Sequence, residues 1–429
     1  MTYQQSIDYL YNSLPVFQKV GASAYKPGLG TSVALDDLFG NPHRKYPTVH
    51  IAGTNGKGST AHTLAAVLQS AGYKVGLYTS PHLFDFRERI RVNGEKISHE
   101  AVVSFVERWF EKSRIAPYNV LSPSFFELTS TMAFEYFADE NVDVAIIETG
   151  LGGRLDSTNI IMPVLSVITN ISLDHTSLLG NTIREIAYEK AGIIKHGVPV
   201  VIGEWQKETE QVYADKAEEE EAELIYATPV EAEITPGGIS YHSTLYGDFT
   251  GELKGEYQIK NTATVLAALS VLAKRGFEIT PKAVHEGFAN VTQLTHLMGR
   301  WHTLSEHPLT VCDTGHNAGG WQYITDQLNS YTSGSVHLII GFAADKDITP
   351  VLTMIATLTV PVNLYFSSPS VKRGLDADSL SKKAASVGLR GEVVADVNDA
   401  LALARERADA DNDMILIAGS NFLIADLKL

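Results

Sequence analysis

The chain has very little cysteine and no long hydrophobic run. Its 429 residues include a single cysteine, Cys312, which excludes an intramolecular disulfide. No stretch approaches the ~18 consecutive apolar residues that cross a bilayer. The polar stretch from Met1 to Tyr11 does not have the pattern of a secretory signal peptide. These features are typical of a reducing compartment, and we expect a cytoplasmic protein.

Positive charge is also scarce. Lysine and arginine number 34 against 50 aspartate and glutamate residues, which gives a formal net charge of −16. A general nucleic-acid binder needs a basic surface to neutralise phosphates, so we expect no nucleic acid as a partner. In the absence of an apolar span we expect no membrane either. Small anionic ligands remain compatible with this charge, because they need only local hydrogen-bond donors.

The sequence is rich in alternation between apolar, β-rich runs and helical patterns. Continuous apolar runs favour parallel strands covered on both faces, and their alternation with helices predicts a doubly wound α/β domain. Because the alternation restarts after Met298-Gly299-Arg300, we predict two domains, 1–297 and 298–429. The expected strands are 48–52, 74–79, 142–148, 164–170 and 198–202 in the first domain, and 309–312, 336–341, 362–366, 391–395 and 414–418 in the second.

Less regular segments close the first domain. The acidic stretch 204–223 is interpreted as the solvated face of a helix. Residues 232–241 and 245–253 alternate in polarity, with glycines at 237 and 238, and predict short antiparallel strands at the edge of this domain. A helix is predicted over 260–274.

The strongest local signal is a glycine-rich loop after the strand at 48–52. Glycines let backbone N–H groups converge on phosphate, and a following helix N-terminus adds partial positive charge. We expect the helix to open at Ser59, Lys57 to reach the terminal phosphates, and Ser59 or Thr60 to face a metal ion. The strict Walker pattern is not matched, since Ile51 takes its first glycine position and Gly58 follows the lysine. The alternative is a strand–helix turn without a ligand. The loop comprises Gly53, Thr54, Asn55, Gly56, Lys57, Gly58, Ser59 and Thr60.

Two further strands deliver polar groups to the same edge of the predicted sheet. Glu148 ends a buried strand, and the carboxyl ends of such strands face the ligand crevice of an open α/β sheet. A carboxylate there suits Mg²⁺, which prefers oxygen ligands. A structural ion pair is the alternative, and the glycine-dense loop at 150–153 favours the metal. His175 follows the next strand; a lone histidine is more often structural, but three convergent strand ends favour a functional role.

Lys190 falls on the apolar stripe of a predicted helix. Thr182 and Glu185 form a capping box at the start of that helix, and Ile183, Ile186 and Lys190 share one face. Lysine is rarely buried without a partner. The spacing leaves open a functional buried lysine and a lysine that extends its head group to solvent.

Other candidate groups are less specific. Arg87, Arg89 and Arg91 could bind substrate carboxylates or form a solvated basic loop. In the second domain, Asp313 and His316 follow a strand in the same manner as the groups of the first domain.

These blocks together resemble a known family. HIAGTNGKGST, TSPHL, FFELT, ETGLGGRLDSTN, TNISLDHTSLLGNT, EKAGIIK, MGRW, DTGHN and DKD occur in family order over nearly the whole chain. The chain resembles the folylpolyglutamate synthase/dihydrofolate synthase family, relatives of the Mur ligases of cell-wall synthesis. The resemblance implies a P-loop NTPase-type, mostly parallel first domain and a smaller Rossmann-like C-terminal domain, both contributing to the active site.

The resemblance also implies an activity. It is the ATP-dependent addition of L-glutamate to a folate-type acceptor, folate or dihydropteroate, through an acyl phosphate. ATP and Mg²⁺ are the implied cofactors, small molecules are the only implied partners, and we expect a monomer. Two rival functions are a Mur-type ligase acting on a nucleotide-linked peptide precursor and a protein that hydrolyses ATP as a switch.

Site residues carry over position by position. The ATP contacts correspond to the loop from Gly53 to Thr60 with Asn261, Arg300, Asp313 and His316. The Mg²⁺ ligands correspond to Ser80 and Glu148, and His175 corresponds to a ligand of a second metal ion. The substrate contacts correspond to Ser80, Pro81, His82, Arg154 and Asp156. The catalytic roles correspond to Lys57, His175, Lys190 and Arg300, with Lys190 a candidate for carbamylation as a metal-bridging group. The chain departs from the family where Met298 replaces a proline, where DTGHN replaces DGAHN, and where Tyr257 replaces a histidine.

Overall fold

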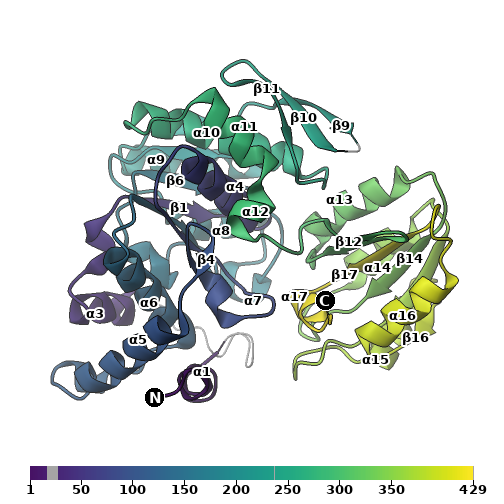
Figure 1. Cartoon of the computed structure of the whole chain (residues 1–429), viewed down its shortest axis with the longest axis horizontal. Helices are drawn as coiled ribbons and strands as arrows, with labels where there is room; N and C mark the ends of the chain where they lie inside the picture. Colours follow the sequence, from purple (N-terminus) through teal and green to yellow (C-terminus); the bar gives the residue numbers. More distant parts are fainter. Residues whose placement is uncertain (17–27, 236, 429) are drawn as a thin grey trace. The chain divides into compact units, whose positions relative to one another are not determined.

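The computed structural model describes residues 1–16, 28–235 and 237–428, which divide into two compact units (Figure 1). Unit 1 comprises Met1–Glu252 and Gln258–Leu297, and unit 2 comprises Leu253–Tyr257 and Met298–Leu429. The short segment Leu253–Tyr257 therefore belongs with unit 2, although the chain returns to unit 1 directly after it. In the described part of the chain, no helix combines the length and apolar character needed to cross a membrane.

Unit 1 is built on an eight-stranded sheet with the order β4-β3-β2-β5-β1-β6-β7-β8. The strands from β2 to β8 in this order pair in parallel, and the β3–β4 hairpin adds an antiparallel edge. All five strands predicted for the first domain are confirmed; the hairpin and β8 were not predicted. The bounds are β1 Thr48–Ala52, β2 Val75–Tyr78, β3 Ile90–Val92, β4 Glu95–Lys96, β5 Val144–Glu148, β6 Leu165–Ile168, β7 Val200–Ile202 and β8 Leu224–Tyr226.

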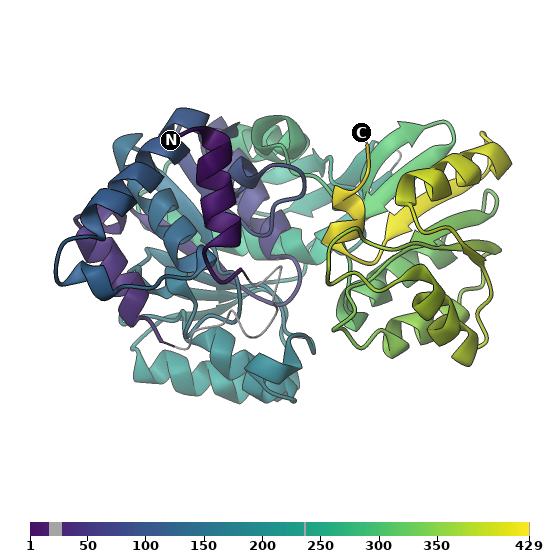
Figure 2. The ribbon, with the colours of Figure 1, turned by 90° about the horizontal axis from the view of Figure 1, so that it is seen from below.

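Helices cover both faces of this sheet. One face packs on α4 (Lys57–Ser70), α10 (Gln258–Lys274) and α11 (Pro281–Ala289). The other face packs on α6 (Phe125–Asp139) around β2 and β5, and on α8 (Ile183–Ala191) and α9 (Lys207–Glu219) around β6 and β7. Further out, α1 (Tyr3–Asn12) lies against α5 (His99–Lys112), as Figure 2 shows, and α3 (Gly30–Leu38) lies against α6. The doubly wound arrangement predicted from the sequence is confirmed.

A small antiparallel sheet belongs to unit 1 but is separate from the main one. It has the order β11-β10-β9, with β9 at Glu231–Thr235, β10 at Gly238–Ser243 and β11 at Gly247–Gly251. The predicted antiparallel strands are confirmed, and they form a sheet of their own. The inward rings of Tyr241 and Phe249 pack on Phe288 of α11, so the small sheet covers a helix and does not extend the main sheet.

Unit 2 has a six-stranded sheet with the order β12-β13-β17-β14-β15-β16, parallel except for β12. The five strands predicted for this region are confirmed, and β12 was missed. Cys312 is buried in β13, as expected of a small core residue. The strand bounds are β12 His302–Glu306, β13 Leu309–Asp313, β14 Val336–Ile340, β15 Val362–Phe366, β16 Glu392–Val393 and β17 Met414–Ala418; the helices are α13 Ala318–Asn329, α14 Thr349–Ala356, α15 Ala377–Ser386, α16 Val397–Arg407 and α17 Asn421–Ala425.

Candidate active site

The glycine-rich loop joins β1 to α4 through two positions that only glycine can occupy. Gly53 has a φ of 149° and Gly56 a φ of 83°, and Gly56 is the residue before the first turn of α4. A Cβ at Gly53 would lie 1.8 Å from Oγ1 of Thr169, and one at Gly56 would lie 2.3 Å from Oδ1 of Asn261. The loop is therefore packed tightly against β6 and α10. The helix begins at Lys57, two residues before the predicted start at Ser59.

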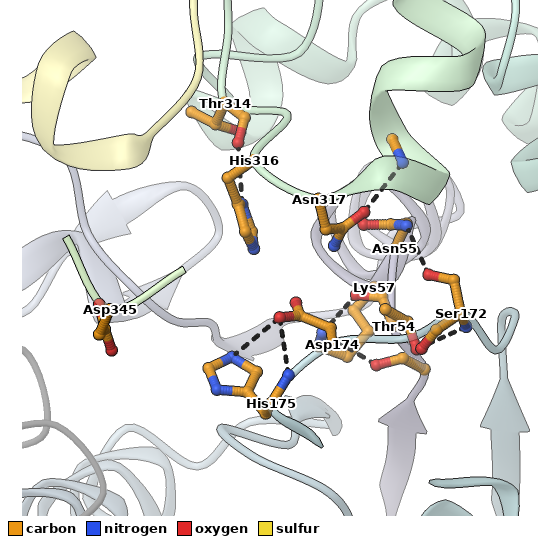
Figure 3. A network of polar contacts seen from close by, with 12 residues as sticks. Thr54, Asn55, Lys57, Ser172, Asp174, His175, Thr314, His316, Asn317 and Asp345 are labelled. Carbon is orange, nitrogen blue, oxygen red and sulfur yellow. Dashed lines mark hydrogen bonds and ion pairs between the residues drawn. The ribbon is translucent and has the colours of Figure 1, made fainter. Parts of the chain in front are cut away.

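The segment after β6 holds the loop from the side. The amide of Thr54 donates to the Asn170 carbonyl (2.8 Å), and the amide of Asn55 donates to Oδ1 of Asn170 (2.9 Å). Ser172 exchanges hydrogen bonds with Thr54 (3.2 and 3.0 Å) and accepts one from Asn55 (Figure 3). The amides of Thr54 and Asn55 are thus engaged. The amides in the first turn of α4 have no intrahelical acceptor, and they are the donors suited to an anion.

Two lysines from different helices meet behind this loop. Lys57 of α4 and Lys190 of α8 both donate to the carbonyl oxygen of Gly53, over 3.0 and 2.8 Å. The side chain of Lys190 is 4% exposed, which excludes a lysine extended to solvent. Burial and the neighbouring Lys57 lower the pKa of Lys190 to about 7, against a smaller opposite effect of Asp174 and Asp156.

The hydroxyl groups of Ser59 and Thr60 are buried in the first turns of α4. The Ser59 hydroxyl accepts from Nε2 of Gln258 (3.2 Å), and Gln258 in turn accepts from Nδ2 of Asn261 (2.8 Å). The Thr60 hydroxyl is buried and has no hydrogen-bond partner among the described residues. The structure therefore brings Asn261 and the loop together through Gln258, a residue that sequence reasoning missed.

Glu204 was expected on the solvated face of an acidic helix, and this expectation is wrong. Glu204 precedes α9, and its carboxylate accepts from Nδ2 of Asn170 (3.0 Å) and from Nζ of Lys260 (2.7 Å). Because Asn170 supports the phosphate loop, this ion pair connects α10 to the loop. The sequence did not reveal this ion pair, because Glu204 begins a run of acidic residues and its partners lie far away in the sequence.

Glu148 and Ser80 lie side by side where two neighbouring strands end. Glu148 closes β5 and is buried, and its Oε2 accepts the backbone N–H of Ser80 (3.1 Å), which follows β2. A buried carboxylate beside a hydroxyl offers the hard oxygen donors that Mg²⁺ prefers. Among the described residues no three His, Cys, Asp or Glu side chains form a ready-made metal cluster.

His175 lies before the short helix α7 (Thr176–Leu179) in a left-handed conformation, with a φ of 50°. Its backbone N–H donates to Oδ1 of Asp174 (2.8 Å), and its ring nitrogen Nε2 lies 3.9 Å from the same oxygen (Figure 3). The ring nitrogen therefore faces the adjacent carboxylate at ion-pair distance. A carboxylate beside an imidazole is an arrangement common among metal-ligating histidines.

The loop after Glu148 is organised around Asp156. This buried carboxylate accepts the amides of Gly150 (2.9 Å) and Leu151 (2.8 Å) on Oδ2, and the amide and hydroxyl of Thr158 (3.0 and 2.5 Å) on Oδ1. Burial raises the pKa of Asp156 despite these hydrogen bonds. The carboxylate therefore shapes its own loop, whatever else it contacts.

Arg154 joins the same loop to the helix that carries Lys190. Its Nη2 and Nε donate to Glu189 (2.8 and 3.2 Å), and its guanidinium lies 5.6 Å from the centre of the Tyr188 ring. The backbone N–H of Arg154 also donates to the Glu189 carbonyl (2.7 Å). The loop and α8 are thus held together next to the lysine pair.

His82, a predicted substrate contact, lies in a chain of three side chains. Its Nδ1 accepts from Nε of Arg89 (2.8 Å), and its Nε2 lies 2.9 Å from the Tyr11 hydroxyl. Burial, together with the Arg89 guanidinium, lowers the pKa of His82 well below its ordinary value. Arg89 is 3% and Arg91 5% exposed, so the interpretation as a solvated basic loop is wrong for both. Arg89 directly precedes the unpredicted strand β3, and Arg91 lies within it.

In unit 2, Asp313 is the centre of a second polar cluster at the end of β13. Its Oδ2 accepts the Tyr257 hydroxyl (2.6 Å) and the Trp301 amide (2.9 Å), and its Oδ1 accepts the Gly315 amide (2.7 Å). Burial and Asp313 raise the pKa of Tyr257 well above its ordinary value. Tyr257, which replaces a family histidine, therefore anchors its segment to unit 2 through a hydroxyl that stays protonated.

Arg300 and His316 flank this cluster. Arg300 donates to the Gly299 carbonyl (3.0 Å) and to the Thr314 hydroxyl. His316 has its Nδ1 3.0 Å from the Thr314 carbonyl (Figure 3), and because a carbonyl only accepts, Nδ1 carries the proton.

Comparisons with known proteins agree with this geometry. The Mur ligase middle domain matches residues 51–269, and the Mur ligase, glutamate ligase domain matches residues 299–421. The dihydrofolate synthase/folylpolyglutamate synthase of Bacillus subtilis is 36% identical, over 94% of both chains. The chain belongs to the folylpolyglutamate synthase/dihydrofolate synthase family.

Solved structures of relatives extend this result to the ligands of the family. FolC of E. coli in complex with DHPP and ADP superposes with a TM-score of 0.85 at 30% identity, covering 99% of this chain and 96% of that chain. The bifunctional folylpolyglutamate synthase/dihydrofolate synthase of Yersinia pestis, complexed with AMPPNP and Mn ion, gives 0.82 at 29% identity, covering 99% and 97%. The predicted family, fold class, ATP-dependent ligase activity, and use of ATP with a divalent cation are confirmed.

Proposed function

We propose that this family member joins L-glutamate to a folate-type acceptor in two steps. A carboxylate of the acceptor first attacks the terminal phosphorus of ATP, which gives an acyl phosphate and ADP. The amine of glutamate then attacks the acyl carbon, an amide forms, and inorganic phosphate leaves. The observation that carries this proposal is the phosphate loop with two lysines held at Gly53, directly beside the amides that begin α4.

In this proposal unit 1 binds the nucleotide phosphates and the metal. The loop from Gly53 to Thr60 supplies the backbone donors, and Lys57 the positive charge that stabilises the transferring phosphoryl group. Ser80 and Glu148 would hold Mg²⁺, and His175 would serve a second metal ion. When bound, Mg²⁺ neutralises charge on the phosphate oxygens during transfer. Asn261 contributes to nucleotide binding, which its position against Gly56 supports.

Lys190 is proposed to carry a carbamate. With its pKa near 7, a large share of this side chain is a neutral amine at neutral pH. A neutral amine attacks carbon dioxide, forms a C–N bond and releases a proton, which converts a buried cation into an anionic oxygen ligand. The nearby ammonium of Lys57 would stabilise that anion, as the shared Gly53 carbonyl contact supports.

The acceptor and the second unit complete the assignment. Ser80, Pro81, His82, Arg154 and Asp156 are proposed to contact the acceptor. Arg300, Asp313 and His316 of the ligase region 298–429 are proposed to act on the nucleotide bound by region 1–297. The orientation of His316 by Thr314 and of Asp313 by three donors supports fixed roles for both.

One assay tests this function. Purified protein is incubated with Mg-ATP, L-glutamate and either dihydropteroate or a reduced folate, and both ADP and the glutamylated product are measured. We expect ADP release only when acceptor and glutamate are both present, with equal amounts of ADP and product. Rapid ADP release with neither present would instead support the ATP-hydrolysing switch.

We further propose that the enzyme acts in the cytoplasm as a monomer and does not bind nucleic acid. The single cysteine, Cys312, supports the cytoplasm, and the net charge of −16 supports the absence of nucleic acid binding. Light scattering after size exclusion should give a mass near the 46.7 kDa of one chain. A mass of a dimer would contradict the monomer.

A further inference from the structure

A series of hydrogen bonds connects the centre of the main sheet to the loop after Glu148, which carries the proposed acceptor contact Asp156. His50 lies in β1 and is completely buried, and its Nε2 is 2.8 Å from the hydroxyl of Thr158. That hydroxyl donates to Oδ1 of Asp156 over 2.5 Å. The other carboxylate oxygen of Asp156 accepts the amides of Gly150 and Leu151. These hydrogen bonds thus run from strand β1, through the side chains of Thr158 and Asp156, to the loop that follows Glu148.

The direction of each hydrogen bond follows from the partners. The Asp156 carboxylate accepts three backbone amides, so the hydroxyl proton of Thr158 is directed at the carboxylate and its oxygen is available as an acceptor. His50 therefore donates from Nε2. Burial, with a contribution from Lys195, lowers the pKa of His50 to about 3, so the ring is neutral and carries its single proton on Nε2.

A role in packing alone does not account for a histidine at this position. His50 pairs in register with Ile147 of β5 and Ser166 of β6, in a layer where apolar side chains dominate. Its Nδ1 is buried and has no hydrogen-bond partner among the described residues. A buried acceptor without a donor is unfavourable for stability, and a leucine at this position would bring no such acceptor. What histidine contributes is the Nε2 donor toward Thr158.

We propose that His50 is a positioning residue of the acceptor site, which fixes the Asp156 carboxylate through Thr158. β1 leads directly into the phosphate loop, so the same strand would set both the nucleotide loop and the acceptor loop. This inference rests on the proposed function, in which Asp156 contacts the acceptor.

Matched variants of His50 separate the donor from the bulk of the ring. His50→Gln keeps an N–H near the position of Nε2, whereas His50→Leu keeps a similar volume without any donor. Thr158→Val removes the hydroxyl with little change of shape. We expect His50→Leu and Thr158→Val each to lower kcat/KM for the acceptor by about tenfold. This is near the upper end of the range for the neutral hydrogen bond that His50→Leu removes, and near the lower end for the hydrogen bond to the carboxylate that Thr158→Val removes. The dissociation constant of ATP should stay within about twofold of wild type, and His50→Gln within about threefold in kcat/KM, because its donor is retained.

The double variant tests whether His50 and Thr158 act through the same series of hydrogen bonds. If His50 acts through Thr158, His50→Leu with Thr158→Val should be no worse than either single variant, because both break one path. Ser166→Ala is the control, since it removes a buried hydroxyl at the same depth that donates to Ile193 (2.7 Å) and lies outside this series of hydrogen bonds. It should retain wild-type kcat/KM for the acceptor.

Three outcomes would overturn the inference. They are a normal kcat/KM for the acceptor in Thr158→Val, equal losses in acceptor and ATP binding, and effects of the two single variants that multiply. Asp156→Asn distinguishes this failure from that of the proposed function. If Asp156→Asn is impaired while His50→Leu and Thr158→Val act normally, only the proposed role of His50 fails. A normal Asp156→Asn would remove Asp156 from the acceptor site, and the inference with it.

Discussion

Lys57 and Lys190 donate to one and the same acceptor, the carbonyl oxygen of Gly53, over 3.0 and 2.8 Å. They come from α4 and α8, which lie far apart in the sequence. Burial, and after it the charge of Lys57, disfavour the ammonium form of Lys190 and lower its pKa to about 7. The pair is therefore suited to an added anion, which a phosphate group or a carbamate would provide.

Removing either charged group at the phosphate site should abolish most of the turnover. We expect Lys57→Ala and Glu148→Ala each to lower kcat by at least about a hundredfold, because a preorganised group at a developing charge contributes roughly 2.7–4 kcal/mol. Circular dichroism should show an intact fold. Lys216→Ala is the control, since this lysine forms a surface ion pair on α9. Near-normal kcat at saturating Mg-ATP in either site variant would refute its role.

Carbamylation of Lys190 can be observed directly. Protein equilibrated with ¹³C-bicarbonate should show one carbamate signal by ¹³C NMR, and the signal should be absent from Lys190→Ala. Because the reaction needs the neutral amine, the signal should grow as the pH rises through about 7, the pKa of this side chain. Lys190→Ala should be inactive and recover part of its activity with short carboxylates. An active wild-type enzyme with no such signal would contradict the proposal.

Stability should also report the lowered pKa of Lys190. Above pH 7 the folded protein has released this proton while the unfolded chain, with a lysine pKa near 10.5, still holds it. The unfolded state then binds more protons, so this residue makes stability rise with pH between about 7 and 10. Lys190→Met should therefore be more stable than wild type at about pH 6, with the gain shrinking toward about pH 9 in urea titrations without carbon dioxide. A gain independent of pH would show that the lysine is not titrating in this range.

Arg300 and His316 should matter for turnover more than for nucleotide binding. If the amides that begin α4 hold the phosphates, Arg300→Ala and His316→Ala should lower kcat strongly and weaken nucleotide binding by no more than about tenfold, or ~1.4 kcal/mol. Nucleotide dissociation constants measured beside kcat decide this. Normal turnover in both variants would exclude unit 2 from the chemistry.

Local patterns were sufficient to predict most strands of the two large sheets. Runs such as Val144–Glu148 are apolar throughout, so they indicate buried parallel strands without further information. The same reasoning missed the β3–β4 hairpin and β12, because Arg91, Glu95 and His302 interrupt any apolar pattern there. A helix start was misplaced at Ser59, because Gly56 can precede a first turn without a side-chain cap.

The hydrogen bonds and ion pairs between polar side chains could not be predicted from the sequence, for a different reason. Glu204 pairs with Lys260, and Tyr257 donates to Asp313, across long separations in the chain. Nothing in the spacing of such residues indicates the partner, because the pairing exists only once the strands and helices have packed. The position of Asp313 at the end of a strand was visible in the sequence, but its contacts were not.

The most direct test of the central claim follows one oxygen atom. The acceptor is prepared with ¹⁸O in its reacting carboxylate and turned over with Mg-ATP and L-glutamate, and the released phosphate is analysed by mass spectrometry. An acyl phosphate requires that a carboxylate oxygen leaves with the phosphate, so we predict one ¹⁸O atom in each phosphate formed. Unlabelled phosphate, formed while ATP is consumed, would contradict the mechanism and with it the assignment of the Gly53–Lys57–Lys190 site to phosphoryl transfer.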